Sequence, residues 1–487
     1  MIDGTFQAGL RNPSMRAAFW VLGVYLIAAL VATKLMGDFA PLGILALILL
    51  PFLVYIFFAD CSFLVLGYLA LMPLIQHLSQ HGAAVGDFDV TPHMVIQFFV
   101  LIAATNSFLF SYDARKNLKL NNLDKTLILF VLLTIFSLIF AYSLPVNHEK
   151  RWLLFYTGIF ENATFYFVIV YITARDEDMA NKILIALAIS SFSAAIAAVQ
   201  ELHEVGFNLI SIFLARMRIG FGYHNTNLFG IHSAILFPLS FFTLVSPRFR
   251  RVRVLAWVGF VILSVLSVLC FNRGTFIVLI IELFLLFFIR ENRKIIYGFF
   301  VAMISAAVYF SHLLLFYIYR FIGGSNSSGD TSYLDTSAMY RYEAWKVGLK
   351  LLYLYPFGVG AGGFQYAWQI YGRYPTLFLG TPHQLFLSIG VDYGVLPMLC
   401  FIAMLILAFV YSEKLSKSAA LNPHFEMFKY VKISLIGFVI YGTITDGELS
   451  HLSGLTLPNN GYTLLLFTLL GIISAYSSKY LVQKAKP

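Results

Sequence analysis

The chain is long, strongly apolar and basic. Of its 487 residues, 60% are hydrophobic and only 12% are charged, whereas soluble domains are about half apolar and about a quarter charged. The net charge of +9 lies mostly in short loops between apolar runs, where it reports membrane orientation rather than nucleic-acid binding. An ordinary soluble enzyme is excluded, and we predict a polytopic membrane protein that does not bind nucleic acid.

The apolar residues fall into runs of about 20, the length that crosses roughly 30 Å of hydrocarbon. The segment 40–78 is either two helices joined by a minimal turn at Ala59 and Asp60 or one long helix broken around Pro51. The fold class predicted is therefore all-α, a bundle of about fourteen transmembrane helices at 17–35, 40–58, 60–78, 93–111, 126–143, 154–173, 181–201, 225–245, 254–271, 274–290, 295–315, 386–411, 430–446 and 461–479.

Basic residues define the orientation of this bundle. At least three Lys or Arg occur in each of the loops 112–125, 246–253, 290–294 and 412–432, and in the C-terminal tail. An even number of predicted spans separates each of these basic segments from the next, so all of them lie on one side of the membrane. Loops rich in Lys and Arg stay in the cytoplasm. Both termini are therefore predicted to be cytoplasmic.

The longest predicted loop lies on the outer face and divides the chain into three parts. Residues 1–315 contain the first eleven helices, residues 316–385 form the loop, and residues 386–487 contain the last three helices and a cytoplasmic tail. The loop combines the turn-rich sequence GGSNSSGDTS with a helical stretch at 338–354. A long, partly ordered loop of this kind is usually functional.

Four of the arginines on the predicted outer side, against the orientation bias, are candidate anion-binding residues. Arg273 stands between two apolar runs, Arg216 and Arg218 end another apolar stretch, and Arg341 belongs to the helical part of the long loop. A guanidinium group matches the oxygens of a phosphate group. Each arginine alone could equally extend to the membrane interface or pair with a carboxylate.

A histidine is the candidate general base. In TPHQLFLSIG, Thr381 is predicted to cap a membrane-entering helix, with Pro382 at its first position and His383 in its first turn. The positive end of a helix disfavours imidazolium, so His383 is expected to be neutral near pH 7 and able to accept a proton. The alternative is a histidine that only bonds a loop carbonyl.

Other sequence patterns are weaker indications of function. The spacing Gly358-x-Gly360-x-x-Gly363 matches a dinucleotide fingerprint but lacks a βαβ unit, so a turn for close helix packing is favoured. Glu282 lies in the middle of a predicted span, where it could be a buried, paired or protonated carboxylate. A proton-relay role for Glu282 would need a partner residue, and we can name none. Cys61, Cys270 and Cys400 lie in apolar runs without metal-ligand spacing. We expect no metal and no cofactor.

Several motifs occur in order along the second half of the chain. They are Arg273-Gly274, then Arg341, Trp345, Pro356, Gly358, Gly360 and Phe364, and finally Pro382-His383 with Gly394. In this order and spacing they resemble the O-antigen ligase and polysaccharide polymerase family, and the resemblance covers roughly residues 200–410. Residues 218–230, with Asn227, are similar to that family's stretch before a span, and departures include Gln384 for Asn, Asp392 for Glu and Pro397 for Gly.

The resemblance implies a GT-C-like glycosyltransferase in a bacterial inner membrane, with its active site on the periplasmic face. It implies an inverting, metal-independent transfer from a glycan on undecaprenyl pyrophosphate, among membrane lipids, to a glycan or lipid acceptor. In that scheme His383 is the base and Arg273 and Arg341 neutralise the pyrophosphate. Arg216 or Arg218, with Asn227 and Gln384, would bind substrate.

Three functions remain open from the sequence. A polymerase, which adds one lipid-linked repeat unit to another, is favoured by the length of the chain and the number of its spans. An O-antigen ligase would instead transfer a finished polysaccharide to lipid A-core. A transporter of polysaccharide or lipid-linked glycan would predict matching broken helices in two halves, and we find no such symmetry.

Overall fold

The structure is a computed structural model, and the description below concerns only part of the chain. The predicted spans 17–35 and 40–58 and the arginines Arg216 and Arg218 lie outside that part. So do Pro51, Ala59 and Asp60, which would decide between the alternatives for residues 40–78. The structure describes residues 61–79, 83–85, 88–90, 96–97, 99–104, 120–140, 152, 154–176, 178–204, 221, 226–270, 272–309, 333–373, 381–419, 423–444, 452–453, 457–458 and 461–482.

The chain forms two compact units. The first contains residues 1–68 and 96–115, and the second contains residues 69–95 and 116–487. Helix α4 (Cys61–Ser79) begins in the first unit and ends in the second, and a short antiparallel hairpin, β1 (Ala83–Val85) and β2 (Phe88–Val90), follows it. The architecture below is that of the second unit.

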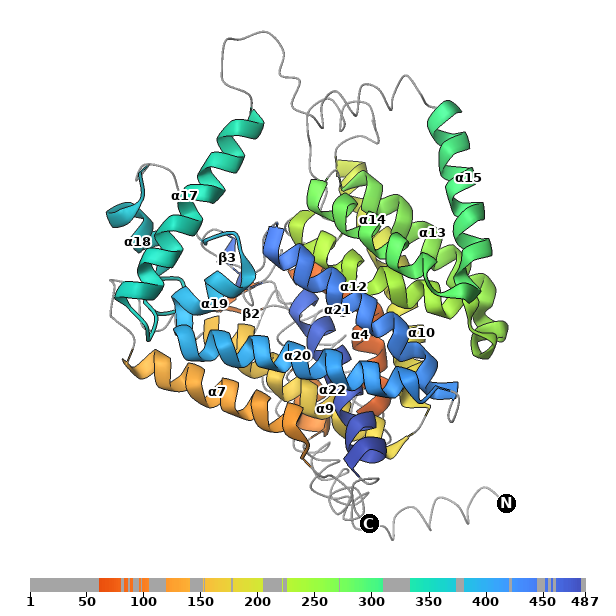
Figure 1. The fold of residues 1–487 in the computed structure, drawn as a ribbon, viewed down its shortest axis with the longest axis horizontal. Coiled ribbons are helices and arrows are strands. Elements are labelled where there is room, and N and C mark those ends of the chain that lie inside the picture. Colours follow the sequence, from red (N-terminus) through yellow and green to blue (C-terminus); the bar gives the residue numbers. More distant parts are fainter. Residues whose placement is uncertain are drawn as a thin grey trace, which may run out of the picture. The chain divides into compact units, whose positions relative to one another are not determined.

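The second unit is a bundle of apolar helices with a second small hairpin (Figure 1). Its first half contains α7 (Asn122–Phe140), a π-helical turn (Tyr156–Phe160) leading into α9 (Glu161–Arg175), α10 (Met179–Glu204), α12 (Thr226–Val245), a 3-10 turn (Pro247–Val252), α13 (Arg253–Leu269), α14 (Arg273–Phe287), a 3-10 turn (Arg290–Asn292) and α15 (Arg293–Tyr309). Its second half contains α17 (Tyr333–Leu354), α18 (Phe364–Tyr371), α19 (Leu385–Tyr393), α20 (Val395–Lys417), a 3-10 turn (Pro423–Glu426), α21 (Met427–Ile444), β3 (Leu452–Ser453), β4 (Leu457–Pro458), α22 (Gly461–Ser477) and a π-helical turn (Ser478–Val482).

Seven of the described helical segments are long and apolar enough to cross a membrane, so the prediction of a multi-pass membrane protein is confirmed. Helices α9, α14 and α15 coincide with other predicted spans but are shorter. The seven are Asn122–Phe140, Met179–His203, Asn227–Val245, Pro247–Leu269, Val395–Lys417, His424–Ile444 and Thr463–Leu481.

One predicted span is wrong in its continuity. Residues 386–411 do not form a single helix, because α19 ends at Tyr393 and α20 begins at Val395. Gly394 between them has φ +97°, and a Cβ there would lie 2.6 Å from the carbonyl oxygen of Pro356. The Val395 N–H donates to that oxygen at 2.9 Å. A glycine in the left-handed region thus breaks the span so that a distant segment can bind its backbone.

The core of the bundle is built around α12, which is buried along nearly its whole length and packs against α10, α13, α14, α21 and α22. Small residues let these helices approach closely, as is common in membrane bundles. By contrast, α7 exposes large apolar side chains along one face, including Leu132, Ile139 and Phe140. In a membrane protein such a face contacts lipid.

A buried polar network ties three helices together near the start of α7. The Asp124 Oδ1 atom accepts hydrogen bonds from Tyr166 Oη of α9 at 2.7 Å and from Ser474 Oγ of α22 at 2.6 Å. Asn121 Nδ2 also donates to Ser477 Oγ at 2.9 Å. Because these polar groups satisfy one another, they fix the relative positions of α7, α9 and α22 inside an apolar bundle.

Candidate functional site

Arg273 is the first residue of α14, directly after a tight connection from α13. Asn272 caps the helix, since its Oδ1 atom accepts the Thr275 backbone N–H at 3.2 Å. The Asn272 Nδ2 group donates to Oδ1 of Asn227, near the start of α12. Asn272 thus links Asn227 to Arg273, which is half-buried. The sequence interpretation missed Asn272, although the Asn-Arg-Gly-Thr order fits a helix cap.

The starts of α12 and α14 are held against the end of α21. A Cβ on Gly230 of α12 would lie under 3.0 Å from both the Tyr441 hydroxyl of α21 and the Thr275 hydroxyl of α14. The absence of a side chain at Gly230 therefore creates the space in which these two residues meet. Tyr441 is fully buried, so the last turn of α21 lies beside the turn that carries Arg273.

Arg341 approaches the same end of α21 from another direction. It lies on α17, which begins at Tyr333, five residues before the predicted start. Its Nη1 atom donates to the carbonyl oxygen of Ile444 at 3.2 Å, and Ile444 is the last residue of α21. The C-terminal carbonyls of a helix carry partial negative charge, which suits a guanidinium partner.

The predicted cap before His383 is wrong. The helix begins at Leu385, and Gln384 is its cap, with Oε1 accepting the Leu387 N–H. His383 has φ +54° and therefore cannot belong to the first helical turn. Thr381 instead accepts the His383 backbone N–H at 3.1 Å, forming a tight turn before the helix.

His383 nevertheless reaches the same region. A Cβ on Gly442 of α21 would touch Leu385 at 3.0 to 3.1 Å, so the start of α19 packs on the residue after Tyr441. The last turn of α21, Tyr441 to Ile444, therefore contacts the segments that carry Asn227, Arg273, Arg341, His383 and Gln384. Arg216 and Arg218, which precede α12, lie outside the described residues.

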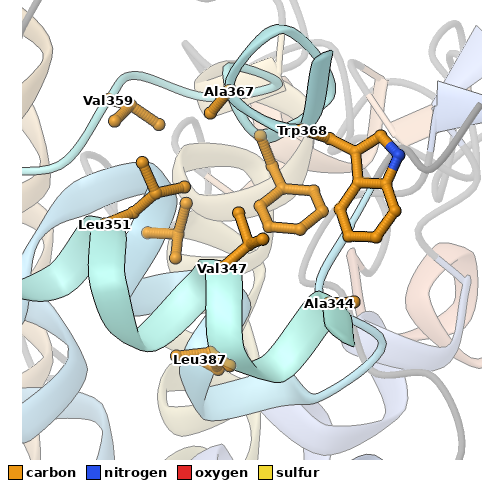
Figure 2. Close-up of a cluster of buried hydrophobic side chains, with 9 residues drawn as sticks. Ala344, Val347, Leu351, Val359, Ala367, Trp368 and Leu387 are labelled. Carbon is orange, nitrogen blue, oxygen red and sulfur yellow. The ribbon is translucent and has the colours of Figure 1, made fainter. Parts of the chain in front are cut away.

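An apolar cluster makes α17 and α19 one packed piece (Figure 2). It places Val347 and Leu351 of α17 against Trp368 of α18 and Leu387 of α19. Its buried members are Ala344, Val347, Leu351, Val359, Phe364, Ala367, Trp368, Leu387 and Val391. Arg341 and His383 are consequently carried on elements that share a core.

The glycine pattern at 358–363 is part of this packing. Gly358 has φ +88°, and a Cβ there would lie 2.6 Å from the carbonyl oxygen of Asp392. The next two residues bind α19, since Val359 N–H donates to Val391 O at 2.8 Å and Gly360 N–H to Asp392 O at 3.1 Å. The interpretation of these glycines as a turn for close packing agrees with this geometry.

A comparison with known families bears on this region. Residues 258–402 match the family model described as O-antigen ligase. This match supports the resemblance of that segment to the O-antigen ligase family. The matched segment is less than a third of the chain and contains Arg273, Arg341 and His383. No curated protein matches the chain.

Similarity to this family implies a membrane enzyme that acts on lipid-linked glycans. The arrangement around α21 suits an anionic group of such a substrate. Two arginines and the N-terminal ends of α12 and α14 lie at one end of the bundle, and helix N-termini and guanidinium groups both favour anions. Among the described residues, no group of three His, Cys, Asp or Glu side chains could hold a metal ion.

Proposed function

We propose that this protein is a glycosyltransferase that polymerises oligosaccharide repeat units linked to undecaprenyl pyrophosphate, on the periplasmic face of a bacterial inner membrane. The observation that carries the proposal is the convergence of Arg273, Arg341 and the His383 segment on the last turn of α21. Such a site offers a base and two cations to a substrate that reacts by losing a pyrophosphate.

The reaction proposed is an inverting displacement. His383 takes the proton of an acceptor hydroxyl, whose oxygen forms a bond to the anomeric carbon of the donor while the bond from that carbon to the pyrophosphate oxygen breaks. Arg273 and Arg341 neutralise the charge that develops on the departing pyrophosphate, which is the role of preorganised cations in transfer reactions. Positioning and one general base suffice because the leaving group is already activated.

The remaining predicted residues take positioning roles in this scheme. Arg216 or Arg218 would hold the pyrophosphate from the segment before α12. Asn227 and Gln384 would contact the donor or acceptor sugar, although each already has a bond in the structure: Asn227 to Asn272, and Gln384 to the start of α19. We assign them to substrate binding, with no cofactor and no metal.

The proposal includes the architecture that surrounds the site. We propose about fourteen spans in a GT-C-like arrangement, with residues 1–315 and 386–487 in the membrane, residues 316–385 covering the site, and both termini in the cytoplasm. The seven described segments that could cross a membrane support this arrangement. The even number of predicted spans between successive basic loops supports the orientation.

A ligase that transfers a finished polysaccharide to lipid A-core is the second candidate. The description of the matching family favours it, whereas the length of the chain favours a polymerase. Both candidates use the same chemistry at His383 and differ in the acceptor. A transporter fits less well, because the arginine and histidine segments converge at one end of the bundle.

The deciding experiment is deletion of the gene in its host, followed by complementation and analysis of the glycans by size and attachment. Repeat units that never lengthen would indicate a polymerase, and full-length polymer left on the lipid carrier would indicate a ligase. His383→Ala should fail to restore the glycan, whereas His424→Ala, beyond the opposite end of α21, should restore it. Full rescue by a normally expressed His383→Ala protein would exclude the base assignment.

A further inference from the structure

Helix α17 has an exposed apolar face opposite the face that packs in the core. The exposed fractions are 57% for Tyr342, 37% for Trp345, 61% for Leu349 and 86% for Tyr353. These residues are spaced by three or four positions, so they form one stripe along the helix. A contiguous stripe of large apolar side chains on the surface marks an interaction site.

The C-terminal end of α17 is fixed to the ends of two membrane spans. Just beyond it, the carbonyl oxygen of Phe357 accepts a hydrogen bond from Ser137 of α7 at 2.7 Å, and the rings of Phe357 and Phe136 meet edge to face at 6.2 Å. The carbonyl oxygen of Pro356 accepts the Val395 N–H, at the start of α20. Phe357 is half-exposed and continues the apolar outer face of α7.

The other part of α17 is fixed to a third span through the bond from Arg341 to Ile444. Helices α20 and α21 are joined by a short connection at their opposite ends, so the start of α20 and the end of α21 lie on the same side of the membrane. The thirteen steps from Arg341 to Leu354 correspond to about 20 Å of helix. Because this length is fixed at both ends to the same side of the bundle, α17 runs across the ends of the spans and not away from them.

Lysines border the apolar stripe. Lys346 lies over the ring of Tyr342, with 4.3 Å between its Nζ atom and the ring centroid, and Lys350 lies over Tyr371 at 4.7 Å. The side-chain bond from Lys346 to Glu343 raises the pKa of the lysine above its ordinary value, and a lysine is cationic at neutral pH even without that bond. Aromatic residues with lysines at their border are typical of helices in the headgroup region of a bilayer.

We propose that α17 is an in-plane membrane helix whose stripe of Tyr342, Trp345, Leu349 and Tyr353 is seated in the headgroup and upper acyl region of the phospholipid bilayer. Lys346 and Lys350 face the lipid phosphates, with their aliphatic stems along the apolar stripe. The helix thereby holds Arg341 at the depth where the pyrophosphate of a lipid-linked donor lies. The choice of leaflet and of this ligand rests on the proposed function.

The test measures depth in the bilayer and not activity. Leu349→Cys and Tyr353→Cys would each be labelled with bimane in full-length protein, in nanodiscs of phosphatidylcholine and phosphatidylglycerol. Cys61, Cys270 and Cys400 are buried, and labelled wild-type protein measures their background. Lys182→Cys, in the first turn of α10 where the exposed side chain pairs with Asp176 of the preceding connection, is the control for water. Leu132→Cys, on the exposed face of α7, is the control for the bilayer.

Lipids spin-labelled near the headgroup should quench the labels at positions 349 and 353 at least twice as strongly as the label at position 182. Aqueous iodide should quench them at most half as strongly as position 182. Iodide quenching equal to that at position 182, at both positions, would overturn the proposal. If added oligosaccharide then lowered that quenching, the face would be a carbohydrate surface. Either result leaves the His383→Ala test of the proposed function intact.

Discussion

Gly437 and Glu282 offer a direct test of how α14 and α21 pack. Glu282 of α14 is fully buried, and a Cβ on Gly437 of α21 would lie 2.9 Å from its carboxyl carbon and closer still to Oε1. Gly437→Ala must therefore displace the carboxyl group from its rotamer, and overpacking of a dense core costs about 1–3 kcal/mol. We expect a loss of about 2 kcal/mol in the free energy of unfolding.

Thermal unfolding of the purified protein in nanodiscs, followed by intrinsic tryptophan fluorescence, would measure this loss. We expect the apparent Tm of Gly437→Ala to fall by roughly 2 °C. In a Glu282→Ala background the same change should cost under about 1 kcal/mol, because the remaining close neighbour is the carbonyl oxygen of Ala234 at 3.2 Å. Gly298→Ala on α15, where a Cβ meets nothing within 4 Å, is the matched control and should not destabilise. Equal costs in the two backgrounds would refute the proposed packing.

Three further predictions concern the last turn of α21 and its neighbours. Gly230→Ala should lower glycan transfer in membranes at least about tenfold, because a 1 Å shift near a site has effects of this order. Adding Tyr441→Phe in the same chain should restore part of the transfer. Wild-type transfer by Gly230→Ala would contradict the close contact. Arg341→Lys should keep membrane insertion but lose most transfer activity, since an ammonium group lacks the planar fork of donors; wild-type turnover would show that charge alone suffices. Gln384→Ala should lower the free energy of unfolding by about 1 kcal/mol through loss of a helix cap, whereas Gln384→Asn should retain most of it; equal stability of Gln384→Ala and wild type in urea titrations would exclude the capping role.

The sequence predicts the elements of this fold better than their breaks. Hydropathy identifies most described helices, because crossing a bilayer requires about 20 apolar residues whatever their neighbours. It does not reveal the break at Gly394, because that break depends on backbone bonds to Pro356, far away in the chain. The order of motifs likewise selects segments that the structure brings to the last turn of α21.

The local geometry of the site was harder to predict. The Thr-Pro-His order fits a helix start, yet the left-handed backbone of His383 moves the start to Leu385 and gives the cap to Gln384. Arg341 was expected to meet an anion, and its bond to the carbonyl of Ile444 depends on where α21 ends. Such contacts between distant segments leave no local signal in the sequence.

Helix α21 shows why the matched segment is not sufficient for the site. Residues 258–402 carry Arg273, Arg341 and His383, but the turn on which their segments converge lies at 441–444. Asn272, next to Arg273, donates its side-chain hydrogen bond to Asn227, which also lies outside the matched segment. A chain limited to the matched residues would leave Glu282 and Thr275 without the α12 and α21 surfaces that now bury them, and uncovering such polar groups to lipid is costly. The matched segment therefore contains the three residues proposed to react, while the helices before and after it fix the distances between the segments that carry them.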